Sequence, residues 1–116
     1  MSTTSIEPGD LYLAEILFTS GEAAKVRPAL VLWLDADDCV VCLITSVGPR
    51  GERDVVLQDW SEAGLLRPST CRIGRPTTLE QRLLIRRIGR ISDRDGHTLA
   101  QAWYTHNRPG WDTIPW

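Results

Sequence analysis

Short apolar runs rich in β-branched residues follow one another closely between residues 11 and 91 of the chain. Turn-forming residues separate them: Pro8-Gly9-Asp10 precedes the first, an acidic turn at 35–38 divides the second from the third, and a glycine- and proline-bearing loop spans 47–53. Runs this short with such boundaries are typical of β-strands. We therefore predict strands at 11–18, 28–34, 39–46, 54–58, 69–75 and 82–91, with a hairpin at the 35–38 turn.

One helix is predicted after the last strand. Ser92 and Asp95 form an S-x-x-D helix-opening box, although Gly96 weakens the helix that follows. Helical spacing there places Leu99, Ala102, Trp103 and His106 on one face. Residues 59–64 are predicted to make a single helical turn closed by a glycine. Short strands followed by one helix predict a mainly β fold, a small and strongly bent barrel with a C-terminal helix.

The length and composition fit one ordinary globular domain. The chain has 116 residues, 42% apolar and 24% charged, which argues against global disorder. No apolar run is long enough to span a membrane, and the N-terminal residues lack the features of a signal peptide. We expect a cytoplasmic protein with no membrane association. Its single domain would cover 1–116, with a core at about 8–107 and a tryptophan-containing tail at 108–116.

The spacing of Cys39 and Cys42 is that of a C-x-x-C motif. Both lie in a predicted strand, where side chains three residues apart point to opposite faces, so the two thiols could not share a metal ion or a bond. The chain has three cysteines, an odd number that makes a disulfide framework improbable. Buried core thiols are the better interpretation.

Charge is distributed unevenly along the chain. The net charge is −2, but residues 1–66 carry eleven acids against four bases, whereas 67–116 carry nine arginines against four acids. Arginine carries a planar guanidinium group that can donate two parallel hydrogen bonds to the oxygens of a phosphate. The arginine-rich half has two readings of equal weight, a nucleic-acid surface or the solvated face of a β-sheet.

The stretch KVRPALVL at 25–32 places Arg27 directly before Pro28 and an apolar strand. Because proline restricts the residue before it to extended geometry, the side chain of this arginine starts from a constrained point of the backbone.

The two histidines are nine residues apart on the predicted helix, face roughly opposite sides, and cannot form an acid–base pair. No metal-ligand motif and no nucleotide-binding glycine loop is present, so we expect neither metal nor cofactor. Any catalysis would therefore depend on arginine, carboxylate and hydroxyl groups.

Several segments then occur in a specific order: PGDLY at 8–12, GE at 21–22, KVRPALVL at 25–32, LITS at 43–46, GLLRPS at 64–69, and the strand 83–91 with RIG at 87–89. In this order they resemble segments of the MazF/PemK family of bacterial toxin endoribonucleases. The corresponding family segments are the opening strand GD(I/V), an acidic residue in the first loop, RPALVL, ITS, GL-(K/R)-PS and -KLG-L. The resemblance covers about residues 8–104, and the ordered set is far more specific than any single motif.

The resemblance implies an SH3-like curved barrel with a terminal helix, a homodimer, and a cognate antitoxin protein as partner. It also implies metal-independent cleavage of single-stranded RNA, in which the ribose 2′-OH attacks its own phosphate and leaves a 2′,3′-cyclic phosphate and a 5′-OH. By position in the motifs, Arg27 and Thr45 would be catalytic, and Glu22 is a candidate base. The further candidates for substrate contacts are Lys25, Ser46, Arg72, Arg75 and Thr78.

The chain departs from the family pattern at Thr77, where an arginine is usual. Arg72 and Arg75 are both close enough in sequence to compensate for the missing contact. Trp111 and Trp116, in the tail, could pack on the barrel, form a dimer contact or stack on RNA bases. The alternative function is a non-catalytic binding module or inactive toxin relic, or an inhibitor of a protein target like the related CcdB gyrase poisons.

Overall fold

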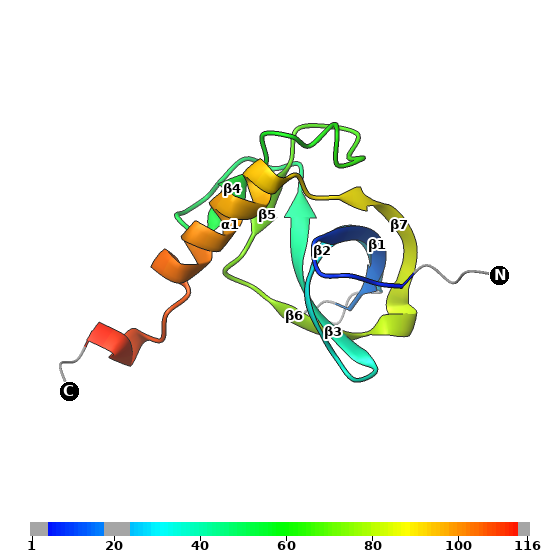
Figure 1. Cartoon of the computed structure of the whole chain (residues 1–116), viewed down its shortest axis with the longest axis horizontal. Coiled ribbons are helices and arrows are strands. Elements are labelled where there is room, and N and C mark those ends of the chain that lie inside the picture. Colours follow the sequence, from blue (N-terminus) through cyan, green and yellow to red (C-terminus); the bar gives the residue numbers. More distant parts are fainter. Residues whose placement is uncertain (1–4, 18–23, 114–116) are drawn as a thin grey trace.

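The computed structural model describes residues 5–17 and 24–113. These residues form seven strands, one α-helix and two short 3₁₀ helices (Figure 1). Their bounds are β1 Asp10–Ile16, β2 Lys25–Asp35, β3 Asp38–Thr45, β4 Asp54–Val56, β5 Thr70–Arg72, β6 Thr77–Glu80, η1 Gln81–Leu83, β7 Leu84–Arg90, α1 Asp93–His106 and η2 Gly110–Thr113.

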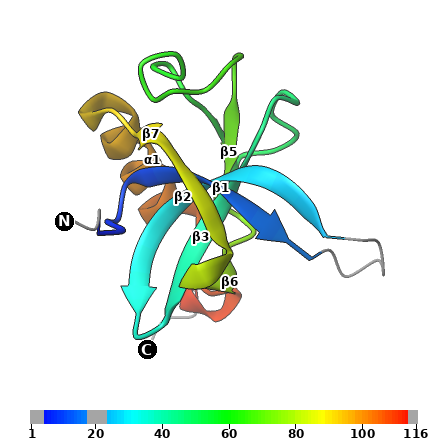
Figure 2. The same ribbon diagram turned by 90° about the vertical axis from the view of Figure 1, so that its right-hand side faces the viewer.

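The strands form one antiparallel sheet in the order β4-β5-β3-β2-β1-β7. Strand β3 has β2 on one side, and on its other side β6 pairs with its first half and β5 with its last residues. The sheet bends strongly around the molecule, as Figures 1 and 2 show, but in the described residues its end strands β4 and β7 do not pair to close a ring. The predicted mainly β architecture with one C-terminal helix is confirmed.

The two faces of the sheet pack into two separate apolar clusters. Cys42 lies with Leu30 and Leu99 in the cluster beneath α1, whereas Cys39 lies with Val41 in the other cluster. The two thiols therefore point to opposite faces, as predicted, because side chains alternate along β3. All three cysteines are free and buried.

Helix α1 is locked to the sheet at its N-terminus. Ser92 caps the helix, its Oγ accepting a hydrogen bond from the Asp95 backbone N–H (3.1 Å). The Asp95 carboxylate is buried and accepts the backbone N–H groups of Gln58 and Asp59 (2.9 and 2.8 Å). The predicted cap is thus confirmed, while the acidic member of the box holds the loop after β4.

The predicted helical turn at 59–64 is also present. The Ala63 N–H donates to the Asp59 carbonyl (3.1 Å), and Gly64 ends the turn with a φ of 94°. The hairpin at 35–38 joins β2 to β3, with Asp35 opposite Asp38. Strand β6 had not been predicted, and it forms because Thr77 to Glu80 find partners along the first half of β3. Among the described residues, no helix has the length and apolar character needed to cross a membrane.

Candidate active site

Arg27 and Thr45 come together where β2 and β3 reach the same edge of the sheet. The antiparallel ladder between β2 and β3 has Ala29 opposite Leu43 as its last pair, so Arg27 and Thr45 both lie two residues beyond the same end of it. Pro28 has no N–H to donate, and the pairing of β2 with β3 covers only Ala29 and the residues after it. The strand pairing thus positions the two residues that the family motifs had identified separately.

Both side chains line one hollow of about 430 Å³. Ser46, which follows Thr45, and Arg72, from β5, line it as well. Arg72 is brought there because β5 pairs with the last residues of β3, Thr45 opposite Thr70. The remaining lining residues are Leu43, Ile44 and Val47. Two guanidinium groups and two hydroxyls around one hollow make a site suited to an anion.

The contacts of these groups leave them available to a ligand. Arg27 is exposed, and its Nη1 donates to the Val26 carbonyl (3.3 Å), a neutral acceptor that does not offset the charge of the guanidinium group. The Thr45 Oγ1 accepts the Val47 backbone N–H (3.1 Å), so the hydroxyl hydrogen can still be donated. The Arg72 Nε lies 3.6 Å from the Asp54 Oδ1, which holds this guanidinium at the edge of the hollow.

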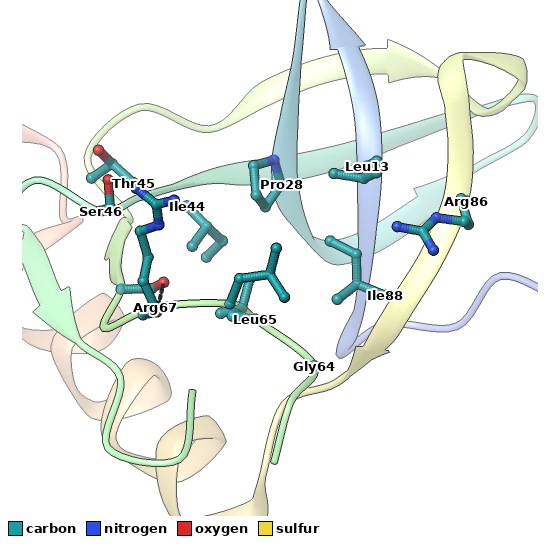
Figure 3. A pocket seen from close by; sticks show the side chains of 12 residues that line it. Leu13, Pro28, Ile44, Thr45, Ser46, Gly64, Leu65, Arg67, Arg86 and Ile88 are labelled. Atoms are coloured by element: carbon teal, nitrogen blue, oxygen red, sulfur yellow. Dashed lines mark hydrogen bonds between the residues drawn. The ribbon is translucent and has the colours of Figure 1, made fainter. Parts of the chain in front are cut away.

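A second hollow, of about 290 Å³, adjoins the first and shares Ile44, Thr45 and Ser46 with it. Figure 3 shows its apolar part, where side chains from β1, β2, β3, β7 and the loop before β5 converge. The guanidinium groups of Arg67 and Arg86 extend toward it from opposite sides. The apolar side chains that line it are Leu13, Pro28, Ile44, Leu65, Leu66 and Ile88.

Two glycines place the loop that carries Arg67. A Cβ on Gly89 would lie 2.1 Å from the Ala63 carbonyl oxygen, and one on Gly64 would lie 2.5 Å from the Ile88 carbonyl oxygen. Only glycine permits this approach of the 59–64 turn to β7. The turn therefore delivers Leu65 and Arg67 to the hollow next to Thr45.

The structure brings together Arg27, Thr45, Ser46 and Arg72, and it places Arg75 in a neighbouring hollow that Arg72 also lines. Lys25 is exposed on β2, two residues before Arg27 and hence on the same face of the strand.

Thr78 does not reach this site: it lies on β6 opposite Val40, along the first half of β3, and its predicted role in substrate binding stays a prediction. Thr77, the departure from the family pattern, is paired with Val41 in the same ladder. Glu22, the candidate base, lies outside the described residues.

Arg67 and Arg86 had not been predicted as site residues. The signal for Arg67 was present, because it is the basic residue of the GLLRPS segment already matched to the family. Arg86 stands next to Arg87 on β7, and alternation along the strand turns their side chains to opposite faces. The Arg87 Nη2 accordingly lies 3.3 Å from the buried Asp10.

Solved structures with this fold include toxins and toxin–antitoxin complexes. The Mycobacterium tuberculosis toxin MazF-mt6 has a TM-score of 0.68 at 21% identity, covering 86% of this chain and 98% of that one. An endoribonuclease in complex with its cognate antitoxin, from a mycobacterial species, has a TM-score of 0.71 at 17% identity, covering 97% and 99%. A MazE-MazF structure from Deinococcus radiodurans has a TM-score of 0.68 at 19% identity, covering 89% and 93%.

No curated protein matches the chain by sequence. The sequence pattern of the family described as the PemK-like, MazF-like toxin of type II toxin–antitoxin systems matches it over residues 7–103. That match covers most of the chain and includes Arg27, Thr45, Arg67 and Arg72. The chain therefore belongs to the PemK-like, MazF-like family of type II toxins.

Proposed function

We propose that this protein is the endoribonuclease toxin of a toxin–antitoxin pair and that it cleaves single-stranded RNA without a metal ion. The observation that carries the proposal is the meeting of Arg27, Thr45, Ser46 and Arg72 around one hollow. These groups can bind a phosphodiester and stabilise additional charge on it, which is what RNA cleavage by an internal nucleophile requires.

In the proposed reaction the ribose 2′-oxygen forms a bond to the adjacent phosphorus, and the bond from phosphorus to the 5′-oxygen of the next nucleotide breaks. A base accepts the 2′-hydroxyl proton, and the leaving 5′-oxygen takes a proton from water. The products are a 2′,3′-cyclic phosphate and a 5′-OH end. Negative charge builds on the nonbridging oxygens in the transition state, where the Arg27 guanidinium and the Thr45 hydroxyl would donate hydrogen bonds.

Other groups of the site have supporting roles in this proposal. Arg72 and Ser46 would hold the scissile phosphate from the β5 side of the hollow, and Lys25 would contact a phosphate nearby. Glu22 is the proposed base for the 2′-hydroxyl, which requires surroundings that raise its pKa toward neutrality. The apolar hollow beside Thr45 would receive the base next to the cut, since nucleobases bind to apolar surfaces through their flat faces.

The proposed partners follow from family membership. Two of the similar structures are complexes, one of an endoribonuclease with its cognate antitoxin and one of MazE with MazF. We infer that this chain likewise binds a cognate antitoxin, and we propose that it acts as a homodimer in the cytoplasm. Thr77, in place of the usual arginine, is the one feature that favours the alternative of a non-catalytic relic.

The test is cleavage of a long RNA by the purified protein in the presence of EDTA. We expect discrete cuts with cyclic phosphate ends, and Arg27→Ala should reduce the rate by about 100- to 1,000-fold, as removal of a transition-state donor does. Arg82→Ala is the matched control, because Arg82 is exposed and paired with Glu80 away from the hollow (2.8 Å), and it should cleave like the wild type. A folded wild-type protein that cuts no RNA would refute the proposal and favour the relic.

A further inference from the structure

We propose that the RNA substrate extends from the candidate active site along β4 and β5, where a trough of four arginines binds the phosphates on one side of the cut. The arginine trough consists of Arg50, Arg53, Arg72 and Arg75. This inference rests on the proposed function, and it assigns that function a substrate-binding surface that extends beyond the catalytic hollow.

The trough is continuous with the site. Its hollow has a volume of about 380 Å³ and includes Arg72, which also lines the hollow of Arg27 and Thr45. A smaller hollow of about 30 Å³ joins the two, because Thr45, Arg50 and Arg72 all line it. A strand leaving the scissile phosphate on the side of Arg72 therefore enters the trough directly.

The carboxylates in the trough do not cancel its positive charge. Four guanidinium groups line it against the two carboxylates of Glu52 and Asp54. Asp54 is engaged, since its Oδ2 accepts the Arg50 backbone N–H (2.9 Å) and its Oδ1 lies 3.6 Å from the Arg72 Nε. The result is a local excess of positive charge in a chain whose net charge is −2.

The position of Arg53 supports the same conclusion. Its Nε and Nη2 donate to the His106 carbonyl at the end of α1 (3.0 and 2.6 Å), a neutral acceptor that orients the guanidinium without removing its charge. Its aliphatic part lies against Gly74, where an added Cβ would come within 2.9 Å of the Arg53 Cδ. Arg53 is thus held along the trough with its charge intact.

Single-stranded RNA is the ligand that these features favour. A polyanion that begins at a phosphate-cleaving hollow presents further phosphates at regular intervals, and planar guanidinium groups bind phosphate oxygens in pairs. Arg50 and Arg75 lie exposed at the rim, available to the backbone of a passing strand. Such contacts carry no base specificity, so the trough would contribute affinity and orientation to the substrate.

The test measures binding of a 2′-O-methylated single-stranded RNA, which keeps its phosphates but lacks the attacking hydroxyl. For an RNA of about 16 nucleotides, each lost phosphate contact should reduce the magnitude of the slope of log K against log salt concentration by about 0.7. For a fragment of about 4 nucleotides, which is too short to reach the trough, the substitutions should leave the slope unchanged. We expect a decrease of about 0.7 for Arg75→Gln and about 1.4 for Arg50→Gln/Arg75→Gln. Arg82→Gln, which removes the same charge outside the trough, should leave the slope unchanged.

An unchanged slope in the double variant would overturn the proposal. It would also be overturned if the double variant bound RNA normally but lost binding of polyglutamate, because the trough would then bind an acidic protein segment. The cleavage assay separates the two proposals. If the trough proposal alone fails, Arg27-dependent cleavage persists while the salt slopes do not differ. If catalysis alone fails, no RNA is cut, yet the double variant still shows the reduced slope. A wild type that binds no RNA would overturn both.

Discussion

Gly89 shows at the scale of a single residue how an absent side chain shapes the candidate active site. The Ala63 carbonyl occupies the space that a Cβ would need, and this contact seats the loop that carries Leu65 and Arg67. The family's -KLG-L segment therefore has a physical reason for its glycine in this chain. The requirement is steric and local, but its consequence appears at a hollow formed by distant segments.

Replacement of Gly89 by alanine should lower the free energy of unfolding by about 3 kcal/mol, the upper range for overpacking a tight contact. Gly96→Ala is the matched control. A Cβ there would lie 3.8 Å from the Ile91 Cγ2, an ordinary contact, and alanine is favoured over glycine in a helix by up to about 1 kcal/mol. Urea unfolding should thus show changes of opposite sign. Equal stability of Gly89→Ala and the wild type would contradict the steric account.

The cysteines give a second prediction at this scale. A hydrogen bond with the Cys42 thiol, together with burial, raises the pKa of Cys71 well above its usual range, and burial raises the pKa of Cys39. Thiolate, the reactive form, is therefore scarce at both. We expect a thiol reagent at pH 8 to leave the native protein unmodified and to label all three cysteines in urea. Rapid labelling of the native protein would show that the thiols are accessible.

Among the elements, α1 depends on charges at its first turn. Asp59, in the loop after β4, accepts hydrogen bonds from the Ser92 Oγ (2.6 Å) and from the Arg94 guanidinium (Nε, 3.1 Å). The hydrogen bond from Arg94, followed by that from Ser92, lowers the pKa of Asp59. Asp95 binds the same loop from within the helix. Two carboxylates thus attach the helix to the loop after β4: Asp59 of the loop binds the start of the helix, and Asp95 of the helix binds the loop.

Because the pKa of Asp59 is lower in the folded state than the unfolded value of about 3.9, its deprotonated form stabilises the fold. That stabilisation is present above about pH 4 and is lost as the pH falls through the folded-state pKa. The difference in unfolding free energy between the wild type and Asp59→Asn should be largest near neutral pH and should shrink in acid.

Urea unfolding at a series of pH values measures this difference. Arg94→Gln removes the main partner, so Asp59→Asn should have a smaller effect in that background. A difference that stays constant down to about pH 3 would mean that the carboxylate charge does not contribute.

At the scale of the whole molecule, large apolar side chains remain exposed on a single chain. Leu66, on the rim of the apolar hollow, is 91% exposed, and Trp111, in the tail, is 64% exposed. Most of the Trp111 side chain is therefore accessible for a dimer contact or for stacking on RNA bases, which stay its proposed roles. Trp116 lies outside the described residues.

We predict that the protein sediments at twice the mass of one chain, because a homodimer interface would remove exposed apolar surface from water. Analytical ultracentrifugation over a range of concentrations checks this. Dissociation on dilution should follow mass action, and a co-expressed cognate antitoxin should shift the mass upward. A monomeric mass at every concentration would contradict the predicted dimer.

Local pattern along the chain was sufficient to predict the main strands, the 35–38 hairpin, the 59–64 turn, the Ser92 cap and the opposite orientation of Cys39 and Cys42. Each depends on side-chain alternation, turn chemistry or capping within a few residues. Arg27 and Thr45 were identified through ordered family motifs. The pairing of β6 with β3, the joining of Arg72 to Arg27 and Thr45, and the positions of Arg67 and Arg86 required the folded chain. Register between distant strands and the approach of a loop to a bent sheet are set by long-range packing, which no short stretch of sequence encodes.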